Sequence, residues 1–327
     1  MRLDADVAVL LDKLNDWDAA AGPQTTIEGA RKRIEEMRAL YFEPELLDVG
    51  KVENVAVAGP EGAIPARIYR PDTEAATLPT VLYLHGGGWV MGGLDSHESH
   101  ARRVCTRAGS VVVAVDYRLA PEHPFPAGYD DCLASLHWIH DTIDRLGGDA
   151  SRVAVAGDSA GGNLAAAVAL AARDAELPLR AQLLLYAPVH LGTRYPSMDE
   201  LADGYFIRMP ADEEMGVGYL DDRSLTADPR VSPIEGDLTG VAPAIVCGAE
   251  FDPLRDHAPA YAAALEAAGV PVRLRISAGM LHGYWSMGVA PRAHDLANGL
   301  CDELAEMLAP EQHGLHYREP HERVAGT

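Results

Sequence analysis

A serine stands in the middle of a short run of glycine and alanine at residues 157–162 (GDSAGG). The run follows the apolar, β-rich segment 153–156 and precedes a segment of helical composition. Small residues in a tight turn between a strand and a helix let the backbone pass closely and expose the central hydroxyl. The pattern therefore predicts that Ser159 is a nucleophile. The alternative is a glycine-rich helix cap with an incidental serine.

A second glycine run, at residues 85–89 (HGGGW), stands at the end of an earlier apolar segment. Consecutive glycines can turn backbone N–H groups toward one point, where they stabilise the negative charge of a tetrahedral intermediate. We expect Gly87 and Gly88 to supply two such donors, with the N–H of Ala160 as a third. A phosphate-binding loop is the alternative, but neither GK[ST] nor GxGxxG accompanies the run. His85 is expected to orient the loop.

A serine hydroxyl at its ordinary pKa is a weak nucleophile, so it needs a base and a group that orients the base. His282 follows the last predicted strand, and Asp252 follows the strand before it. The order Ser159, Asp252, His282 along the chain is that of α/β-hydrolases and differs from the orders in chymotrypsin and subtilisin. Asp256 is the alternative acid, although it lies a turn into the following helix.

Metal and cofactor chemistry has no support in the sequence, and we expect neither a metal nor an organic cofactor. His97 and His100 lie at the start of a charged helix and are expected to be surface or structural residues. The 4 cysteines are far apart and lack CxxC spacing, so they are expected to be buried thiols in a reducing compartment.

The elements that must hold these residues are short apolar segments separated by helical ones. Segments that are apolar on both faces are typical of parallel strands covered by helices. Segments 52–58 and 66–69 are expected to pair in antiparallel fashion around a turn. The alternation predicts an α/β fold. The remaining expected strands are 81–84, 111–115, 153–156, 183–186, 244–246 and 272–276, and helices are expected at 130–146, 162–173 and 259–268.

The chain is expected to consist of a catalytic core, a cap and a tail. Residues 49–189 and 233–309 form the predicted core. Helical periodicity in residues 1–48 and the irregular, acidic segment 190–232 predict a cap over the active edge of the sheet. The polar tail, 310–327, is expected to be mobile.

Apolar and aromatic residues near the predicted site are candidates for substrate contact. An insertion at the carboxyl edge of the sheet would line the cleft through which substrate enters. The alternative for the cap residues is that they only pack the cap onto the core. The candidates are Trp89, Tyr205, Phe206, Ile207, Met209 and Tyr284.

Several motifs together resemble those of the hormone-sensitive lipase family of esterases. They are residues 85–89 (HGGGW), 116–122 (DYRLAPE), 157–162 (GDSAGG), 252–256 (DPLRD) and 282–283 (HG). Their order and approximate spacing are those of the family, and the resemblance covers about residues 50 to 305.

The resemblance implies the α/β-hydrolase fold, with an eight-stranded, mostly parallel sheet, helices on both faces and a helical cap. It implies the same nucleophile, acid, base and oxyanion donors as the residues themselves do. It also implies that Arg118 and Glu122 hold the loop beside the oxyanion strand. Similar esterases are often dimers, so a homodimer is compatible with it.

The formal net charge of -22 repels phosphate backbones and anionic headgroups, so we expect a neutral substrate and no nucleic-acid partner. No segment reaches transmembrane length and the N-terminus lacks a signal-peptide pattern, so we expect a cytoplasmic location. The sequence thus predicts a serine carboxylesterase that hydrolyses short- to medium-chain neutral esters through an acyl-enzyme. An amide or peptide hydrolase on the same triad and a non-catalytic ligand-binding receptor are the alternatives.

Overall fold

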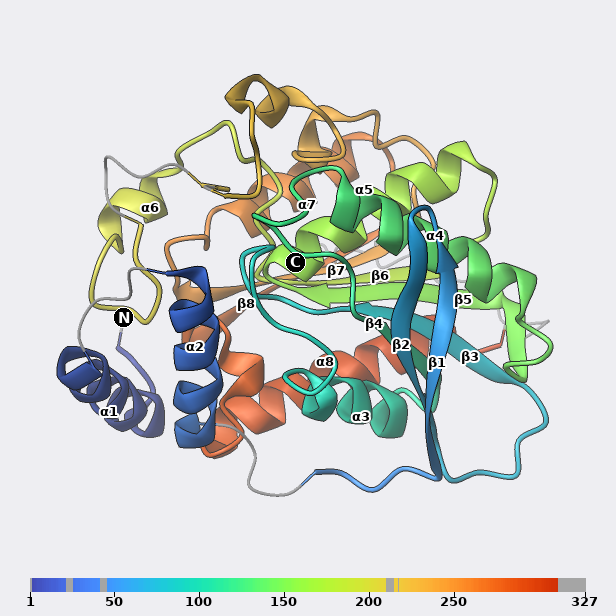
Figure 1. Cartoon of the computed structure of the whole chain (residues 1–327), viewed down its shortest axis with the longest axis horizontal. Coiled ribbons are helices and arrows are strands. Elements are labelled where there is room, and N and C mark those ends of the chain that lie inside the picture. The colour runs from blue at the N-terminus through green and yellow to red at the C-terminus, as the bar shows by residue number, and fades with distance from the viewer. Residues whose placement is uncertain (1, 22–25, 42–45, 210–214, 217, 311–327) are drawn as a thin grey trace, which may run out of the picture.

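The computed structural model describes residues 2–21, 26–41, 46–209, 215–216 and 218–310, and its centre is one sheet (Figure 1). The strands are β1 (Lys51–Gly59), β2 (Gly62–Arg70), β3 (Leu78–Leu84), β4 (Val111–Val115), β5 (Gly148–Asp158), β6 (Ala181–Leu185), β7 (Ala244–Phe251) and β8 (Val272–Leu281). The 8 strands lie in the order β1-β2-β4-β3-β5-β6-β7-β8. Strand β2 is antiparallel to β1 and β4, and the other neighbours are parallel. The predicted α/β-hydrolase fold with a mostly parallel, eight-stranded sheet is confirmed.

Side chains of the central strands alternate between two buried clusters because successive residues of a strand point to opposite faces. In β3, Leu82 and Leu84 join the cluster on one face, whereas Val81 and Tyr83 join the cluster on the other. Both faces are covered, which explains why these strands are apolar throughout.

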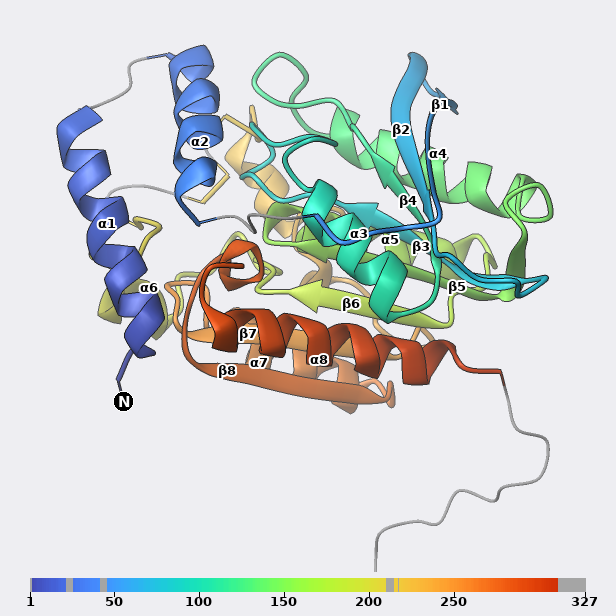
Figure 2. The ribbon, with the colours of Figure 1, turned by 90° about the horizontal axis from the view of Figure 1, so that it is seen from below.

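Helices α4 (Ala127–Asp141), α5 (Ala160–Asp174) and α7 (His257–Ala267) cover one face of the sheet. Helices α3 (Glu98–Arg107) and α8 (Pro291–Leu308) cover the other (Figure 2). The three expected core helices correspond to α4, α5 and α7, with ends displaced by a few residues.

The N-terminal helices α1 (Ala5–Ala21) and α2 (Ile27–Tyr41) lie with α6 (Pro196–Glu200) beyond the end of the sheet toward which β6 points (Figure 2). Helix α1 buries residues at the predicted helical spacing, namely Val7, Leu10, Leu11 and Leu14. The N–H of Asp4 donates to the carbonyl oxygen of Gly279 at 3.1 Å, which ties the chain before α1 to β8. Short 3-10 helices at Arg223–Ala227, Pro233–Glu235 and Tyr284–Ser286 complete the elements of the described chain.

Helix α2 is held to the core by the guanidinium of Arg31. Its Nε donates to the carbonyl oxygen of Val90 at 2.7 Å, and its Nη2 donates to that of Ala120 at 3.0 Å. The same guanidinium pairs with both carboxylate oxygens of Glu122 at 2.8 Å. Glu122 therefore connects the DYRLAPE segment to helix α2.

Arg118 joins two other elements. It forms a two-point ion pair with Asp131 of α4, at 2.9 Å for each hydrogen bond. It also pairs with Glu61, in the turn between β1 and β2, at 2.6 Å. Arg118 and Glu122, which were expected to hold this loop, thus bind it to different elements. Arg118 binds it to α4 and the turn between β1 and β2, whereas Glu122 binds it to α2.

The cysteines are all buried free thiols, as expected: Cys105, Cys132, Cys247 and Cys301. None of the helices in the described ranges is long and apolar enough to cross a membrane. The predicted mobile tail lies outside the described residues, apart from residue 310.

Candidate active site

Ser159 occupies the single residue between β5 and α5. Its φ of 52° and ψ of -121° are unusual for a residue with a side chain and mark a strained turn. The turn needs small neighbours, because a Cβ on Gly161 would clash with the carbonyl oxygens of Leu84 and His85. The strand, the tight turn and the helix predicted around Ser159 are all present.

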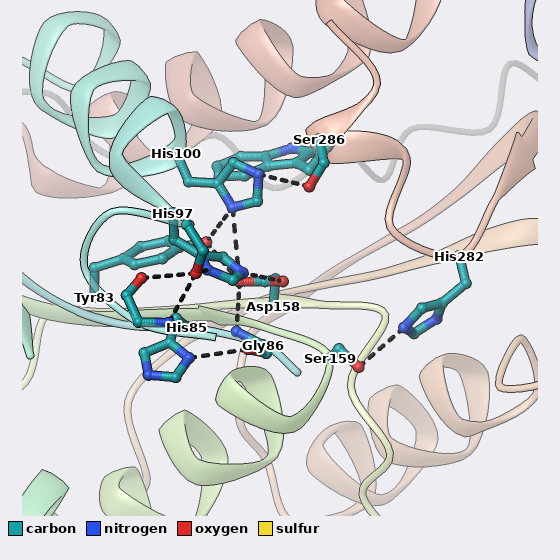
Figure 3. A network of polar contacts seen from close by, with 12 residues as sticks. Tyr83, His85, Gly86, His97, His100, Asp158, Ser159, His282 and Ser286 are labelled. Atoms are coloured by element: carbon teal, nitrogen blue, oxygen red, sulfur yellow. Dashed lines mark hydrogen bonds and ion pairs between the residues drawn. The ribbon is translucent and has the colours of Figure 1, made fainter. Parts of the chain in front are cut away.

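The three predicted triad residues meet at the ends of three parallel strands. Asp252 directly follows β7 and His282 directly follows β8. The distance from Ser159 Oγ to His282 Nε2 is 2.9 Å, and that from His282 Nδ1 to Asp252 Oδ2 is 2.8 Å. When Nδ1–H donates to the carboxylate, Nε2 is left to accept the serine proton. Figure 3 shows His282 facing Ser159 across the gap between the strand ends.

The carboxylate of Asp252 is fully buried, and its second oxygen accepts the N–H of Leu254 at 2.8 Å. The alternative acid, Asp256, instead accepts the N–H of Ser197 at 2.9 Å and pairs with Arg255 at 2.9 Å. Asp252 rather than Asp256 therefore contacts His282.

The glycine loop, residues 85–91, lies beside Ser159 at the end of β3. Gly87 and Gly88 have φ values of 127° and 61°, and a Cβ on Gly87 would clash with the carbonyl oxygen of Met91. Within the described part of the chain, the N–H groups of Gly87, Gly88 and Ala160 donate to no protein acceptor. These groups are thus free to receive an anionic oxygen.

The aromatic candidates of the core are packed rather than open. Trp89 is 4% exposed, and its ring stacks on that of Tyr219 at 4.6 Å. Tyr284 is fully buried, with its hydroxyl 2.9 Å from that of Ser277. Its ring lies 5.7 Å from that of Tyr186, which in turn lies 4.7 Å from the ring of His282. Tyr186, for which the sequence carried no signal, is thus an aromatic residue in contact with His282.

The cap candidates are half-buried and fall into two groups. The ring of Tyr205 stacks on that of Phe251, directly before Asp252, at 5.6 Å. Phe206 lies beside the residue after His282, since a Cβ on Gly283 would be 3.4 Å from its Cε1.

The other two cap candidates are held within their own segment. Ile207 donates its N–H to the carbonyl oxygen of Tyr205 at 3.0 Å, and Met209 donates to that of Ala202 at 2.9 Å. Tyr205 and Phe206 are thus the two cap candidates for which the structure records a contact with residues adjoining the triad.

A polar cluster that the sequence motifs did not predict lies on the side of Ser159 away from His282 (Figure 3). Oδ1 of Asp158 accepts the hydroxyl of Tyr83 at 2.7 Å and the N–H of Gly86 at 3.1 Å. His97 Nε2 lies 3.5 Å from Oδ2 of Asp158, and His100 Nδ1 lies 3.7 Å from Oδ1 (Figure 3). Since His100 is fully buried, the expectation of a surface position for it was wrong and the structural one holds.

Burial and the neighbouring histidines have opposite effects on the pKa of Asp158. Burial disfavours the carboxylate, but the charge of His97 and the nearby imidazole of His100 outweigh it and hold the pKa of Asp158 well below its usual range. Burial, followed by the charge of His97, lowers the pKa of the neighbouring His85 to about 3. His85 is therefore neutral, and its ring stacks on that of Tyr117 at 4.2 Å, which suits the loop-orienting role expected for it.

The ligand atoms of His97, His100 and Asp158 all lie within 4.8 Å of one another, a spacing that could hold a metal ion. However, both ring nitrogens of His100 already have protein partners, the hydroxyls of Tyr83 and Ser286 at 2.9 Å. The cluster is therefore arranged for hydrogen bonding rather than for a cation. A sequence signal did exist: an acidic residue within a buried run needs partners, and two histidines three apart share one face of a helix.

Comparison with known proteins agrees with this geometry. A family model described as the alpha/beta hydrolase fold matches residues 81–286. Carboxylesterase NlhH of Mycobacterium tuberculosis is 43% identical over 305 residues, which cover 91% of this chain and 93% of that protein. Ethyl acetate hydrolase of Pseudomonas putida is 37% identical over 303 residues, covering 88% of this chain and 93% of that protein.

A solved structure is also similar to this chain. The hyperthermophilic esterase from the archaeon Pyrobaculum calidifontis superposes with a TM-score of 0.86 at 33% identity, covering 94% of this chain and 100% of that one. The chain therefore belongs to the α/β-hydrolase fold family and, within it, to the esterases of the hormone-sensitive lipase type.

Proposed function

We propose that this chain is a serine carboxylesterase that hydrolyses short- to medium-chain neutral carboxylic esters through an acyl-enzyme on Ser159. The observation that carries the proposal is the continuous hydrogen-bonded line from Ser159 through His282 to Asp252, with distances of 2.9 and 2.8 Å. Relatives named as a carboxylesterase and an ethyl acetate hydrolase support the reaction class. A receptor has no need of this line of groups, which favours an enzyme.

In the first half of the reaction, Ser159 Oγ attacks the ester carbonyl carbon while His282 Nε2 takes the hydroxyl proton. The buried carboxylate of Asp252 stabilises the imidazolium that forms. His282 then gives the proton to the departing alcohol, and the acyl group remains on Ser159. In the second half, water attacks the acyl-enzyme with His282 again as base, and the carboxylic acid leaves.

The carbonyl oxygen becomes negatively charged in both tetrahedral intermediates. The N–H groups of Gly87, Gly88 and Ala160 receive this charge in the proposed mechanism, because they face no protein acceptor among the described residues. Donors of this kind stabilise the transition state more than the ground state and so raise kcat.

We infer the preference for short- to medium-chain neutral esters from the net charge of the chain and from the bulky side chains near the site. A net charge of -22 disfavours anionic substrates. Bulky side chains border the site: Phe206 lies against Gly283, and the Trp89–Tyr219 stack fills space beside the glycine loop.

We extend the proposal to a cytoplasmic location, a homodimer and a cap made of residues 1–48 and 190–232. Cell fractionation, light scattering of the purified chain and limited proteolysis respectively test these three points.

The decisive experiment is Ser159→Ala, assayed with p-nitrophenyl esters of increasing acyl length. Loss of a triad nucleophile costs on the order of 10⁶ in kcat, so turnover should fall to near background while the unfolding temperature stays close to that of the wild type. An organophosphate should label the wild type at Ser159, as mapped by peptide mass spectrometry. The exposed Ser151→Ala serves as the matched control and should keep full turnover. Labelling at another serine, or turnover surviving in Ser159→Ala, would contradict the proposal.

A further inference from the structure

The buried residue before the nucleophile has no part in the mechanism above, yet it touches two of the loops that build the site. We propose that Asp158, supported by His97 and His100, is a positioning residue that holds the glycine loop at the place from which its N–H groups reach the oxyanion on Ser159. This inference rests on the proposed function and adds a role that the triad does not cover.

The link to the glycine loop is direct. Oδ1 of Asp158 accepts the N–H of Gly86 at 3.1 Å, and Gly86 immediately precedes the proposed oxyanion donor Gly87. The carboxylate also fills the space of a side chain at position 86, because a Cβ there would clash with Asp158 Oδ2. A displacement of Gly86 therefore moves Gly87 and its N–H relative to Ser159, which is bonded to Asp158 in the chain.

The link to the base runs through His100. Its Nδ1 lies 2.9 Å from the hydroxyl of Tyr83, the same hydroxyl that donates to Asp158. Its Nε2 lies 2.9 Å from Oγ of Ser286, in the 3-10 helix that follows His282. One buried cluster thus joins the ends of β3, β5 and β8, which carry the glycine loop, the nucleophile and the base (Figure 3).

The charge on Asp158 has a function that a neutral side chain of similar size fulfils only in part. Its side chain is 7% exposed, and burying a carboxylate costs free energy unless cations and donors surround it. The imidazoles of His97 and His100 lie 3.5 and 3.7 Å from its oxygens, and Tyr83 and Gly86 supply the donors. Replacement by an apolar group leaves the N–H of Gly86 buried without a partner.

The test compares Asp158→Ala with Asp158→Asn. The alanine variant loses the acceptor for Gly86, so kcat should fall by about 100-fold, the lower end of the effect of losing one oxyanion donor, with KM little changed. The asparagine variant keeps one oxygen that can accept from both donors, so its loss should be smaller. This graded rescue distinguishes positioning of the loop from a general need for a buried group.

A second readout addresses the oxyanion directly. A trifluoromethyl ketone adds to the nucleophilic serine and places an alkoxide where the oxyanion of the reaction forms. Its Ki should rise in Asp158→Ala by about the same factor as kcat/KM falls, because both depend on the same donors. The double variant Asp158→Asn/Ser286→Ala should lose less than the product of the two single losses, since contacting residues of one network are not independent.

The matched control is Gln182→Ala, at the opposite end of the sheet. Gln182 is fully buried, and its Nε2 donates to the carbonyl oxygen of Ala242 at 2.6 Å. Removing it should lower the unfolding temperature while kcat and the Ki of the ketone stay at wild-type values.

Several results would overturn the inference. One is an Asp158→Ala variant that is less stable but has wild-type kcat and Ki. If that variant fails to fold, wild-type values in both Asp158→Asn and Ser286→Ala would overturn the inference as well. One equivalent of metal in the purified protein, measured by plasma mass spectrometry, would replace positioning with a cation site. Turnover in Ser159→Ala, in contrast, would overturn the proposed function itself.

Discussion

Serine, histidine and aspartate lie together more than once in the described part of the chain, and two of these arrays, Ser159–His282–Asp252 and Ser286–His100–Asp158, can be compared directly. The serine to histidine distance is 2.9 Å in both. The histidine to aspartate distance is 2.8 Å in the first and 3.7 Å in the second, which is too long for a hydrogen bond. Of these two sets of the same three residue types, the first has the contacts of a catalytic triad and the second does not.

Two further differences separate the arrays. In the second, the hydroxyl of Tyr83 stands between the acid and the base, with distances of 2.7 and 2.9 Å to them. Its serine, Ser286, lies in a 3-10 helix, whereas Ser159 lies at a strained turn beside glycine N–H groups that donate to no acceptor among the described residues. Reactivity therefore follows from the turn and the oxyanion donors as much as from the three side chains, and an organophosphate should leave Ser286 unlabelled.

The sharpest test of this comparison is Asp252→Asn, which keeps the shape of the acid but removes its charge. In a comparable triad such a change lowers kcat by about 10⁴, because the imidazole is no longer held in the right tautomer and its cation is no longer stabilised. Steady-state kinetics with a p-nitrophenyl ester measures the loss. Asp256→Asn is the control and should keep most of its activity. Equal losses in the two variants would remove the distinction between these acids.

Strands and triad could be predicted because their signals are local. The central strands contain continuous apolar runs, and Asp252 and His282 directly follow strands β7 and β8. Helix α8 was missed, although Ala293, Ala297, Leu300 and Leu304 bury one face of it at helical spacing.

The second array could not be predicted in the same way, because its members come from a helix, a strand end and a 3-10 helix far apart in the sequence. The Arg31–Glu122 pair is similar: both residues are partly exposed, and nothing in the periodicity of an exposed arginine identifies its partner. The sequence motifs identify the residues that react, whereas the contacts that hold their loops depend on the tertiary fold.

A smaller effect concerns how stability depends on pH at His257, a buried histidine whose ring has no carboxylate partner within hydrogen-bond distance among the described residues. Neither ring nitrogen of His257 makes a hydrogen bond within the described residues, and burial, followed by the charge of His190, lowers its pKa to about 3. In the unfolded chain a histidine has a pKa near 6.5. The unfolded state therefore binds the extra proton between these values, and the stability that is complete above about pH 6.5 is lost as pH falls toward about 3.

His257→Leu should remove this contribution. Urea unfolding of the wild type between pH 7 and pH 5 includes a loss from His257 of up to about 1.4 kcal/mol per pH unit, and His85 adds a loss in the same direction. The variant should show a correspondingly smaller slope. The exposed His123→Leu is the control and should keep the wild-type slope. Identical slopes in the wild type and His257→Leu would show that His257 is not buried as a neutral ring.

The smallest expected effect belongs to the proposed cap, where Phe206 either borders the acyl site or only packs its segment onto the core. Its ring lies against Gly283, beside the base, so Phe206→Ala should widen the site and favour longer acyl chains. A methylene in an apolar pocket is worth roughly 1–3 kcal/mol, and a half-buried ring should change the ratio of kcat/KM between butyrate and octanoate esters by about ten-fold. Leu201→Ala removes a buried side chain of the same segment and should lower the unfolding temperature without changing that ratio. A ratio unchanged in Phe206→Ala, with lower stability, would assign the residue to packing alone.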